Sequence, residues 1–469
     1  MTLPDDPAEA LMHASTEPST TTPALPDAAP HDLIGVGFGP SNLALAIALE
    51  EHCGQRLGPA RFLFLEKQPE FTWHGNMLLS NSRMQIAYLK DLATLRNPRS
   101  RFTFINYLHE KARLSAFINL QSHYPTRREY NDYLRWAAAH FHGQCAYGET
   151  VTGIEPVRER DQVVALQVHS RNAQGEAQSR RTRNVILGAG GTPHVPPVFA
   201  SLHGARHARV FHSSEYLARV AALNDTQPRR VAVVGGGQSA AEIFLDLAEQ
   251  WPQAQVDLVM RGRALKPADS SPFVNEIFDP QFTDFIYAQP VEQRERILDE
   301  FRNTNYAVVD DDLIARIYDV LYQQRVGGHG HHALLSCHDI QEARAHGNHV
   351  TLHMHERLSG RAVTQHYDVV VLATGYERRT HEALLADVAP WLDGFEGERD
   401  YRLRAQNNFQ PGIYLQGYCE PTHGLSDTLL SILATRASEI ATSLLARGAS
   451  QHDTCAQPTS TARITALAG

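Results

Sequence analysis

The chain has 469 residues, of which 42% are hydrophobic and 20% charged, so we expect two or three domains and exclude a wholly disordered or collagen-like chain. The formal net charge of −9 argues against nucleic-acid binding, and no apolar run approaches the ~18 residues of a membrane span. The five cysteines are odd in number and far apart, which argues against a disulfide framework, a CxxC redox pair and a zinc ribbon.

In chain order, residues 1–30 come first, and they are rich in Pro, Thr and Ala without periodicity, which predicts a disordered extension. They lack the basic start and apolar core of a secretory signal, so we expect a cytoplasmic protein. Beyond them, short apolar runs alternate with amphipathic stretches, a pattern typical of an α/β fold. Strands are expected at Leu33–Val36, Arg61–Glu66, Val185–Leu187, Val231–Val234, Val256–Met260 and Val369–Ala373.

The first strand runs into a glycine turn and then into an apolar helix, the context that a dinucleotide site requires. Gly37 permits the tight turn, and Gly39 lets the backbone approach a pyrophosphate that faces the helix N-terminus. Asn42 stands where the third glycine or alanine of GxGxxG is usual. Glu66 ends the next strand, 24 residues later, as suits an acid that holds a ribose hydroxyl. The alternative is an ordinary glycine turn.

A second glycine turn, at Gly235 and Gly237, also follows a strand and opens a helix. Here the next strand ends in Arg261 and Arg263, with no acid at its tip. An arginine pairs with a 2′-phosphate that an acid would repel, so NADPH is preferred over NADH. The alternative is that both arginines are merely exposed.

Two dinucleotide sites in one chain predict a flavoprotein with FAD in the first and NADPH in the second. The strand Val369–Ala373 supports this, because Thr374 and Gly375 follow it. A buried strand that ends in Ala-Thr-Gly occurs in flavoproteins with two dinucleotide sites, at the point where the chain returns to the FAD domain. An ordinary strand-to-turn glycine is the alternative.

Between these sites, the chain from Pro272 to about Gln324 is expected to be helical and without a strand, because apolar residues such as Leu313, Ile317 and Leu321 repeat at helical spacing. It ends in the histidine-rich loop 327–332, which we expect to be solvated rather than a metal site. The expected order is a disordered extension (1–30), an FAD-binding domain in two parts (31–205 and 371–449), an NADPH-binding domain in two parts (206–271 and 331–370), a helical insertion (272–330) and a flexible tail (450–469).

Several longer runs are more specific than a glycine loop. They are Phe71–Gly75, Met84–Leu92, Phe104–Leu108, Ser271–Phe278, Asn303–Tyr306 and His423–Ser431. With them, about Asp32 to Ala446 resembles the microbial N-hydroxylating flavin monooxygenases, most closely the L-ornithine N5-monooxygenases of siderophore biosynthesis. That family has two Rossmann-like domains, and its helical substrate subdomain falls where the insertion is expected.

The resemblance implies a reaction and an assembly. NADPH reduces FAD, dioxygen adds at the flavin 4a carbon to give a hydroperoxide, and its distal oxygen passes to the side-chain amine of L-ornithine. The amine must first lose its proton, and with a solution pKa of ~10 this predicts an alkaline optimum or a desolvated site. The resemblance also implies a homotetramer and no protein nucleophile.

Site residues follow from the same resemblance. Lys90 matches the position that pairs with the ornithine α-carboxylate, and Asn275 and Asn305 match those that hold the α-amino and α-carboxylate groups. Gln85 matches the residue against the flavin ring near its reactive carbon. As structural alternatives, Lys90 is a surface lysine beside Asp91, and Asn275 is a cap or turn residue.

Other positions match cofactor contacts, namely Trp73 and His74 for the flavin, Ser239 for the nicotinamide cofactor and Arg261 for the adenosine phosphate. The aromatic pair could instead be core. Ser426 or Asp427 is expected to cap a helix that runs on through Leu430, Leu433 and Ile440, with its N-terminus near the flavin pyrimidine. Ser431 stands near the substrate amine or is an ordinary helical serine.

Three alternatives remain. L-Lysine or a diamine could replace ornithine, although Lys90 argues against a diamine because a diamine has no carboxylate. A pyridine nucleotide–disulfide reductase has the same architecture but requires the CxxC pair that this sequence lacks. A non-catalytic flavin or NADPH redox sensor would keep both glycine loops.

Overall fold

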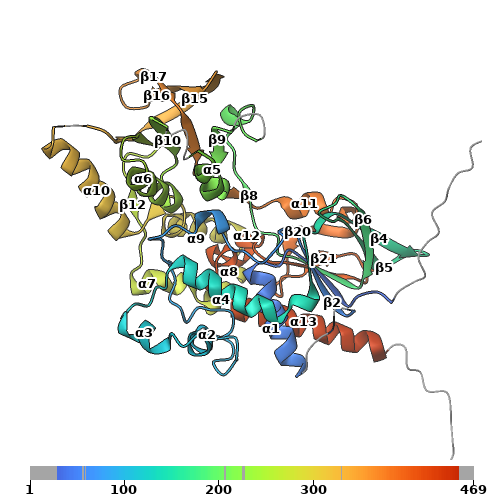
Figure 1. The fold of residues 1–469 in the computed structure, drawn as a ribbon. Coiled ribbons are helices and arrows are strands. Elements are labelled where there is room, and N and C mark those ends of the chain that lie inside the picture. The colour runs from blue at the N-terminus through green and yellow to red at the C-terminus, as the bar shows by residue number, and fades with distance from the viewer. Residues whose placement is uncertain are drawn as a thin grey trace, which may run out of the picture.

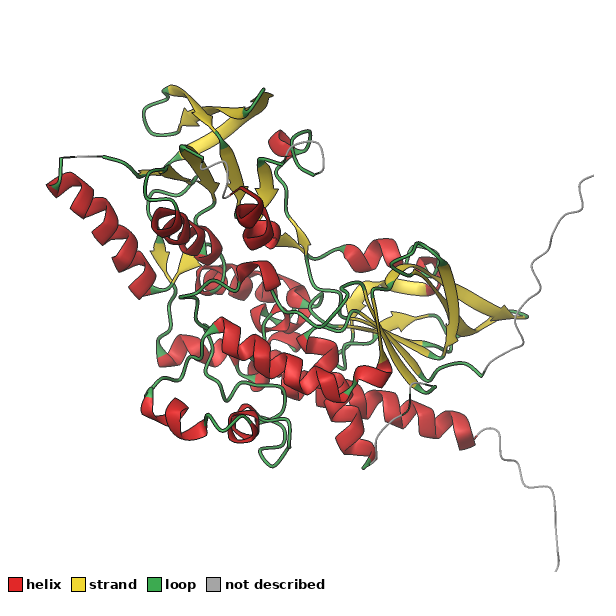
Figure 2. Cartoon of the chain, viewed as in Figure 1, coloured by secondary structure: helices red, strands yellow, loops and turns green. Residues whose placement is uncertain are grey.

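The computed structural model describes residues 29–453 except 55–57, 59, 205–207, 224–227 and 329 (Figure 1). The disordered extension expected over 1–30 lies almost entirely outside the described residues, as does the flexible tail beyond 453. The tail was expected to start at 450, but helix α13 (Leu433–Asp453) continues to Asp453. Figure 2 shows the strands gathered in two regions with helices between them, which confirms the expected α/β class.

The first sheet holds the first glycine turn at the carboxyl end of its central strand. Its five strands are parallel, with Leu33 opposite Phe62 and Ile34 opposite Val185. In sheet order they are β22 (Gly412–Leu415), β7 (Asn184–Leu187), β1 (Leu33–Val36), β2 (Phe62–Glu66) and β3 (Cys145–Tyr147). Helices α1 (Pro40–Cys53) and α13 pack against each other beside it.

The second sheet repeats this plan around the second glycine turn, again with five parallel strands. They are β14 (Ala333–Leu335), β11 (Gln255–Val259), β10 (Arg230–Val234), β18 (Val369–Leu372) and β9 (Val210–His212). All six expected strands are therefore confirmed within the two sheets. Strand β18 crosses the expected boundary at residue 370, because it completes the second sheet beside β10.

Smaller elements cover the two sheets. Antiparallel three-stranded sheets flank them: β4 (Thr150–Glu159), β5 (Gln162–Arg171) and β6 (Ala177–Thr182) on the first domain, and β15 (His338–His346), β16 (His349–Glu356) and β17 (Ala362–Tyr367) on the second. A further pair is β20 (Leu392–Gly397) with β21 (Leu403–Ala405). The remaining α-helices outside the insertion are α2 (Phe104–Glu110), α3 (Leu114–Asn119), α4 (Arg127–His140), α5 (Tyr216–Leu223), α6 (Gln238–Gln250), α11 (Thr380–Leu384) and α12 (Glu420–His423). Among the described residues, no helix is both long and apolar enough to cross a membrane.

The expected insertion consists mainly of α7 (Pro272–Asn275), α8 (Pro280–Tyr287), α9 (Val291–Phe301) and α10 (Asp311–Val326). The expectation that it holds no strand is wrong. The short strand β13 (Val308–Val309) pairs in parallel with β12 (Lys266–Pro267). Both valines are buried, and β-branched residues suit an extended backbone, so the chain returns to the second domain here before α10 begins.

Two short strands carry the chain between the domains. Strands β8 (Thr192–Pro193) and β19 (Tyr376–Glu377) pair antiparallel. Beside them, the Thr374 hydroxyl donates to the carbonyl of His194, and the His194 amide donates to the carbonyl of Gly375 at 2.9 Å. Thr374 and Gly375 therefore lie where the chain passes from the second domain to the first, as expected for the return of the chain.

Candidate active site

A cleft of about 1890 Å³ lies between the two sheets and the helical insertion. Residues from all three parts line it, and twelve of the expected site residues are among them: Trp73, His74, Gln85, Lys90, Gly235, Gly237, Ser239, Arg261, Asn275, Asn305, Thr374 and Ser431. The other five expected positions lie outside this lining: Gly37, Gly39, Asn42, Glu66 and Asp427.

The first glycine loop has the shape that a pyrophosphate needs. Gly37 has φ +82°, and a Cβ there would lie 2.8 Å from the carbonyl oxygen of Gly188, so only glycine fits. Gly39 faces open space, because a Cβ there would meet no described neighbour within 4 Å. No described side chain caps the N-terminus of α1, which starts at Pro40. A phosphate oxygen would therefore find free backbone amides and the positive end of the helix dipole.

Glu66 and Asn42 hold this loop in place. The Glu66 carboxylate accepts from the amides of Phe38 at 2.7 Å and Gln68 at 2.9 Å, and a carboxylate has further acceptor capacity for a ribose hydroxyl. The buried Asn42 amide donates to the carbonyl of Gly37 at 2.7 Å and accepts from Gln416 at 2.8 Å. Asn42 therefore links the loop to the end of β22 by hydrogen bonds. The third glycine of the usual motif would allow close packing of helix and strand but would make no such hydrogen bonds.

The second glycine loop is built by the same rules. Gly235 has φ +149°, and a Cβ there would lie 2.3 Å from the carbonyl oxygen of Ala373. No described side chain caps α6, so the amides at its very start, including that of Ser239, are available. Arg261 is exposed and lines the same cleft just beyond β11. This arrangement fits a second dinucleotide with a phosphate toward Arg261.

Replacing Arg261 by alanine is expected to raise KM for NADPH about ten-fold with little change for NADH, because only NADPH carries the 2′-phosphate that a guanidinium holds. Steady-state kinetics with both cofactors measures this. Arg263→Ala, which removes a guanidinium that donates instead to Ser336 at 3.3 Å, is the matched control. An equal loss for both cofactors would place the phosphate elsewhere.

Trp73 and His74 lie side by side on the cleft wall, with ring centroids 4.8 Å apart. His74 has φ +50°, an uncommon conformation for a residue other than glycine. Its ring touches the solvent of the cleft, yet withdrawal from bulk water and the charges of Arg127 and Arg378 lower its pKa to about 4. His74 is therefore a neutral imidazole at pH 7, able to donate or accept a hydrogen bond without adding charge.

The expected substrate contacts come together in the same cleft. Lys90 faces Asp279, with Nζ and Oδ1 3.7 Å apart, so a carboxylate already stands near the lysine. Asn275, at the end of α7, donates to the carbonyl of Ser270 at 3.0 Å. Ser431 is 2% exposed, and its hydroxyl finds no hydrogen-bond partner among the described residues, which leaves it available to a ligand.

Gln85 also lines the cleft, and its amide donates to Asp310 at 2.9 Å. Asp310 and Gln238, which contact each other in the cleft, were not predicted from the sequence. Their signal is weak: Asp310 precedes a helical pattern and resembles an ordinary cap, and Gln238 directly follows the second glycine turn without a motif of its own.

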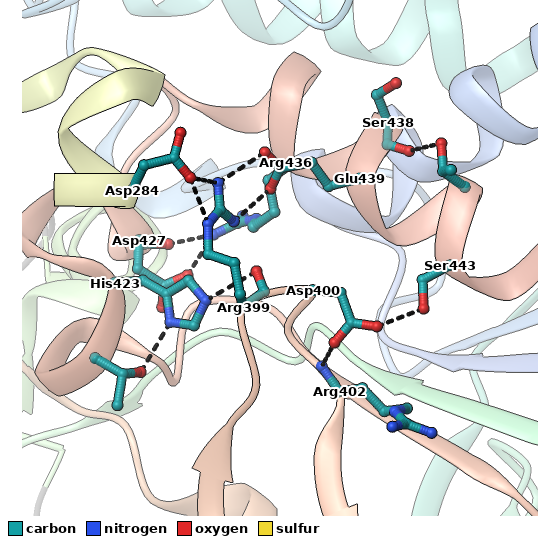
Figure 3. A network of polar contacts seen from close by, with 12 residues as sticks. Asp284, Arg399, Asp400, Arg402, His423, Asp427, Arg436, Ser438, Glu439 and Ser443 are labelled. Carbon is teal, nitrogen blue, oxygen red and sulfur yellow. Dashed lines mark hydrogen bonds and ion pairs between the residues drawn. The ribbon is translucent and has the colours of Figure 1, made fainter. Parts of the chain in front are cut away.

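Asp427 belongs to a network of polar contacts in which Asp427, Arg436 and His423 are buried (Figure 3). It lies in a short 3₁₀ helix, Leu425–Thr428, and α13 starts only at Leu433, so the expectation that Ser426 or Asp427 caps that helix is wrong. The physical reason is that the Asp427 carboxylate is already engaged. It accepts from the amide of Cys419 at 2.7 Å and pairs with Arg436 at 2.9 Å.

Two fully buried histidines make stability depend on pH. Burial is the largest cause that lowers the pKa of His212 and of His423 from 6.5 to about 4. Between these values the unfolded chain binds protons that the folded chain does not, so their stabilisation is present above pH 6.5 and is lost as pH falls toward 4.

We therefore expect each histidine to remove about 1.4 kcal/mol of unfolding free energy per pH unit in that window. Urea unfolding at pH 7.5 and 5.5 measures the loss. His423→Gln, which cannot take up a proton, should show a smaller loss than the unchanged protein. An equal loss in both would contradict the assignment.

The histidine-rich loop is less solvated than expected. His332 is half-buried and accepts from the amide of Val256 at 3.1 Å, because the loop folds back beside β11. His329 lies outside the described residues. Within the ranges given above, no group of three or more His, Cys, Asp or Glu residues could hold a metal ion.

Comparison with known proteins places this chain in a family. The sequence model of the L-lysine 6-monooxygenase/L-ornithine 5-monooxygenase family matches residues 29–378. An L-ornithine N(5)-monooxygenase of Pseudomonas aeruginosa is 51% identical over 425 residues, which cover 90% of this chain and 95% of the relative.

Two solved structures agree. The ornithine hydroxylase PvdA from Pseudomonas aeruginosa has a TM-score of 0.85 at 50% identity and covers 89% of this chain and 99% of its own. An ornithine N-hydroxylase from Kutzneria sp. 744, solved with reduced FAD, NADP⁺ and L-ornithine, has a TM-score of 0.84 at 36% identity. The match covers 89% of this chain and 100% of that protein. This chain therefore belongs to the family of L-lysine 6-monooxygenases and L-ornithine 5-monooxygenases.

Proposed function

We propose that this protein hydroxylates the side-chain amine of L-ornithine to N5-hydroxy-L-ornithine, with FAD, NADPH and dioxygen, for hydroxamate siderophore biosynthesis. The observation that carries the proposal is the common cleft, in which Lys90, Asn275 and Asn305 lie together with the second glycine loop and with Trp73, His74 and Gln85. Relatives at about half identity that hydroxylate ornithine support it.

The residues divide the work by position. The first glycine loop with Glu66 would hold the FAD pyrophosphate and ribose, while Trp73, His74 and Gln85 would face its ring. The second loop with Ser239 and Arg261 would hold NADPH. Bound flavin supplies the redox chemistry that activates dioxygen.

The chain's own task is to bind the amino acid at one end and to leave its amine uncharged at the other. Lys90 would hold the α-carboxylate, and Asn275 and Asn305 would hold the α-amino and α-carboxylate groups. The side-chain amine would then extend away from these groups toward Trp73, His74 and Gln85. Since an ammonium has no lone pair for the oxygen, turnover is expected to rise with pH as the amine loses its proton.

The family includes lysine hydroxylases, so the substrate must be tested directly. One methylene changes binding by only ~1–3 kcal/mol, so lysine is the closest competitor. Lys90 disfavours a diamine, which offers no carboxylate to its ammonium. These facts favour an amino acid and leave chain length to the assay.

The test measures NADPH oxidation and hydroxylamine product in FAD-supplemented protein with ornithine, lysine or cadaverine. We expect about one hydroxylamine per NADPH with ornithine and at least about ten-fold lower kcat/KM for the others. Greater efficiency with lysine or cadaverine would replace the substrate assignment. NADPH oxidation without product from any of the three would instead indicate a redox sensor.

We also propose a homotetramer in the cytoplasm, as the family resemblance implies. Exposed apolar side chains support an assembly: Ile118 and Leu120 are each 63% exposed, and Phe273 is 85% exposed. Light scattering should give four times the chain mass of 52.2 kDa. A monomeric mass at micromolar concentration would contradict the proposal.

A further inference from the structure

Asp310 stands at the N-cap of α10 but does not act as a cap. Its backbone is extended, with φ −61° and ψ 140°, as a cap requires, yet its side chain makes no capping hydrogen bond to the described residues of the helix. Its carboxylate instead accepts from two carboxamides in the cleft, Gln85 on Oδ1 and Gln238 on Oδ2, each at 2.9 Å. An acid in the best capping position is thus used for another purpose.

Gln238 holds Asp310 by two points. Besides donating to the carboxylate, it accepts from the Asp310 backbone amide at 2.9 Å. Its amide nitrogen also donates to Glu242 at 3.0 Å, and Glu242 is gripped by both terminal nitrogens of Arg127 at 2.8 and 2.9 Å. The orientation of Gln238 is therefore fixed, because both of its N–H groups face carboxylates.

This chain of contacts joins the two domains. Gln85 and Arg127 belong to the first domain, Gln238 and Glu242 lie on α6 of the second, and Asp310 stands between β13 and α10, where the chain has returned from the insertion to the second domain. Four of the five line the cleft, the exception being Glu242. The contacts cross 225 residues of sequence between Gln85 and Asp310.

The carboxylate fixes which way round the Gln85 amide sits. An ionised carboxylate only accepts hydrogen bonds, so it selects the amide nitrogen of Gln85 and turns the amide oxygen away. A neutral amide in place of Asp310 could pair with either end. Hydrogen bonds to a charged acceptor are also stronger than neutral ones.

We propose that Asp310 is a positioning residue that orients the Gln85 carboxamide toward the flavin, and that Gln238 anchors Asp310 for this task. The inference rests on the proposed function, since that function places Gln85 against the flavin. It adds a residue at the start of α10 that sets the flavin environment without belonging to either glycine loop.

The main test compares Asp310→Asn with Asp311→Asn, an exposed acid one position further along the same helix. In Asp310→Asn we expect hydroxylated product per NADPH to fall about ten-fold, because the charged hydrogen bond that orients Gln85 is lost. KM for ornithine should change less than about two-fold, because that hydrogen bond affects the reaction and not the binding of ornithine. Asp311→Asn should stay within about two-fold of the unchanged protein. Melting temperatures of both should stay close to the parent, because no capping hydrogen bond is lost.

A second readout does not depend on turnover. The visible absorption of the bound flavin responds to hydrogen bonds near its ring, so Asp310→Asn and Gln85→Ala should shift it in the same direction, and Asp311→Asn should not. Asp310→Ser places another residue that favours the N-cap position there and removes the carboxylate, so it serves if the asparagine variant does not fold. The same shift is expected in it.

The double variant decides whether Asp310 acts through Gln85. Gln85→Ala with Asp310→Asn should be no worse than Gln85→Ala alone, within about two-fold, because two residues that act as a unit are not additive. Multiplied losses, or an unshifted spectrum in Asp310→Asn, would overturn the proposal. Failure of the proposed function gives a different result, because the unchanged protein would then produce no hydroxylated ornithine. The flavin absorption of Asp310→Asn, Gln85→Ala and Asp311→Asn would still show whether Asp310 acts on the flavin through Gln85.

Discussion

Replacing Lys90 by alanine is expected to raise KM for ornithine about 100-fold while NADPH-driven reduction of the flavin stays within about two-fold. The reason is that the lysine would hold the carboxylate equally in the ground state and the transition state, so its loss weakens binding rather than the chemical step. Lys90 is only partly exposed, at 27% of its side chain, and has Asp279 3.7 Å away. Stopped-flow reduction and steady-state kinetics on the same preparation separate the two effects.

Asp279 offers an internal check on this prediction. Its carboxylate stands near Lys90 as the substrate carboxylate would, so it competes for the same ammonium. Asp279→Asn should therefore lower KM for ornithine by a few-fold, in the opposite direction to Lys90→Ala. Lys111→Ala, an exposed lysine outside the cleft, is the matched control and should change nothing. An unchanged KM in Lys90→Ala would remove the lysine from the substrate site.

The parts of this molecule that local chemistry determines were predictable from sequence. Gly37 and Gly235 have positive φ, and a Cβ at either position would also collide with a neighbouring backbone carbonyl. Both reasons require glycine, and that requirement is visible as a glycine after an apolar strand. Buried parallel strands such as Val369–Leu372 are continuous apolar runs, which made both sheets recognisable. The resemblance then brought Lys90, Asn275 and Asn305 together, and the cleft contains all three.

What long-range packing determines was not predictable. Asp310 has the signature of a cap, and only the folded chain shows that its carboxylate faces Gln85 instead. Asp427 likewise precedes a helical pattern, but Arg436, nine positions later, donates a hydrogen bond to its carboxylate, and α13 begins only at Leu433. The wrong cap at Asp427 and the missed role of Asp310 have one cause: local rules relate a polar side chain to the nearest backbone, and in the folded protein a distant partner binds it instead.

The network of polar contacts around Asp427 shows how such a partner supports the site (Figure 3). Arg436 is 1% exposed and lies on α13, where it donates to Asp427 at 2.9 Å and to the Ser41 hydroxyl at 2.9 Å. Ser41 is in the first turn of α1, beside the first glycine loop. Nearby, Arg399 joins Asp284 of the insertion to Glu439 of α13. These pairs tie the helical insertion and the first glycine loop to one C-terminal helix.

Arg436→Met is therefore expected to lower the unfolding free energy by about 3–5 kcal/mol, because it leaves the fully buried Asp427 without its cation. It should also weaken FAD retention, since the contact to Ser41 is lost. Urea unfolding of the FAD-loaded protein and dialysis followed by flavin absorbance measure the two effects. Arg404→Met is the control: it is 58% exposed and 4.0 Å from Glu398, so it should cost less than about 1 kcal/mol.

The double variant Arg436→Met with Asp427→Asn separates charge from shape. Removing both charges leaves no uncompensated ion in the interior, so it should recover much of the lost stability even though two native side chains are gone. The recovery will be incomplete, because the amide of Cys419 keeps only a neutral acceptor and Ser41 still lacks its donor. If the double variant loses as much unfolding free energy as the two single variants together, packing and not the ion pair stabilises the region around Asp427 and Arg436. The buried charge would then not explain why α13 begins beyond Asp427.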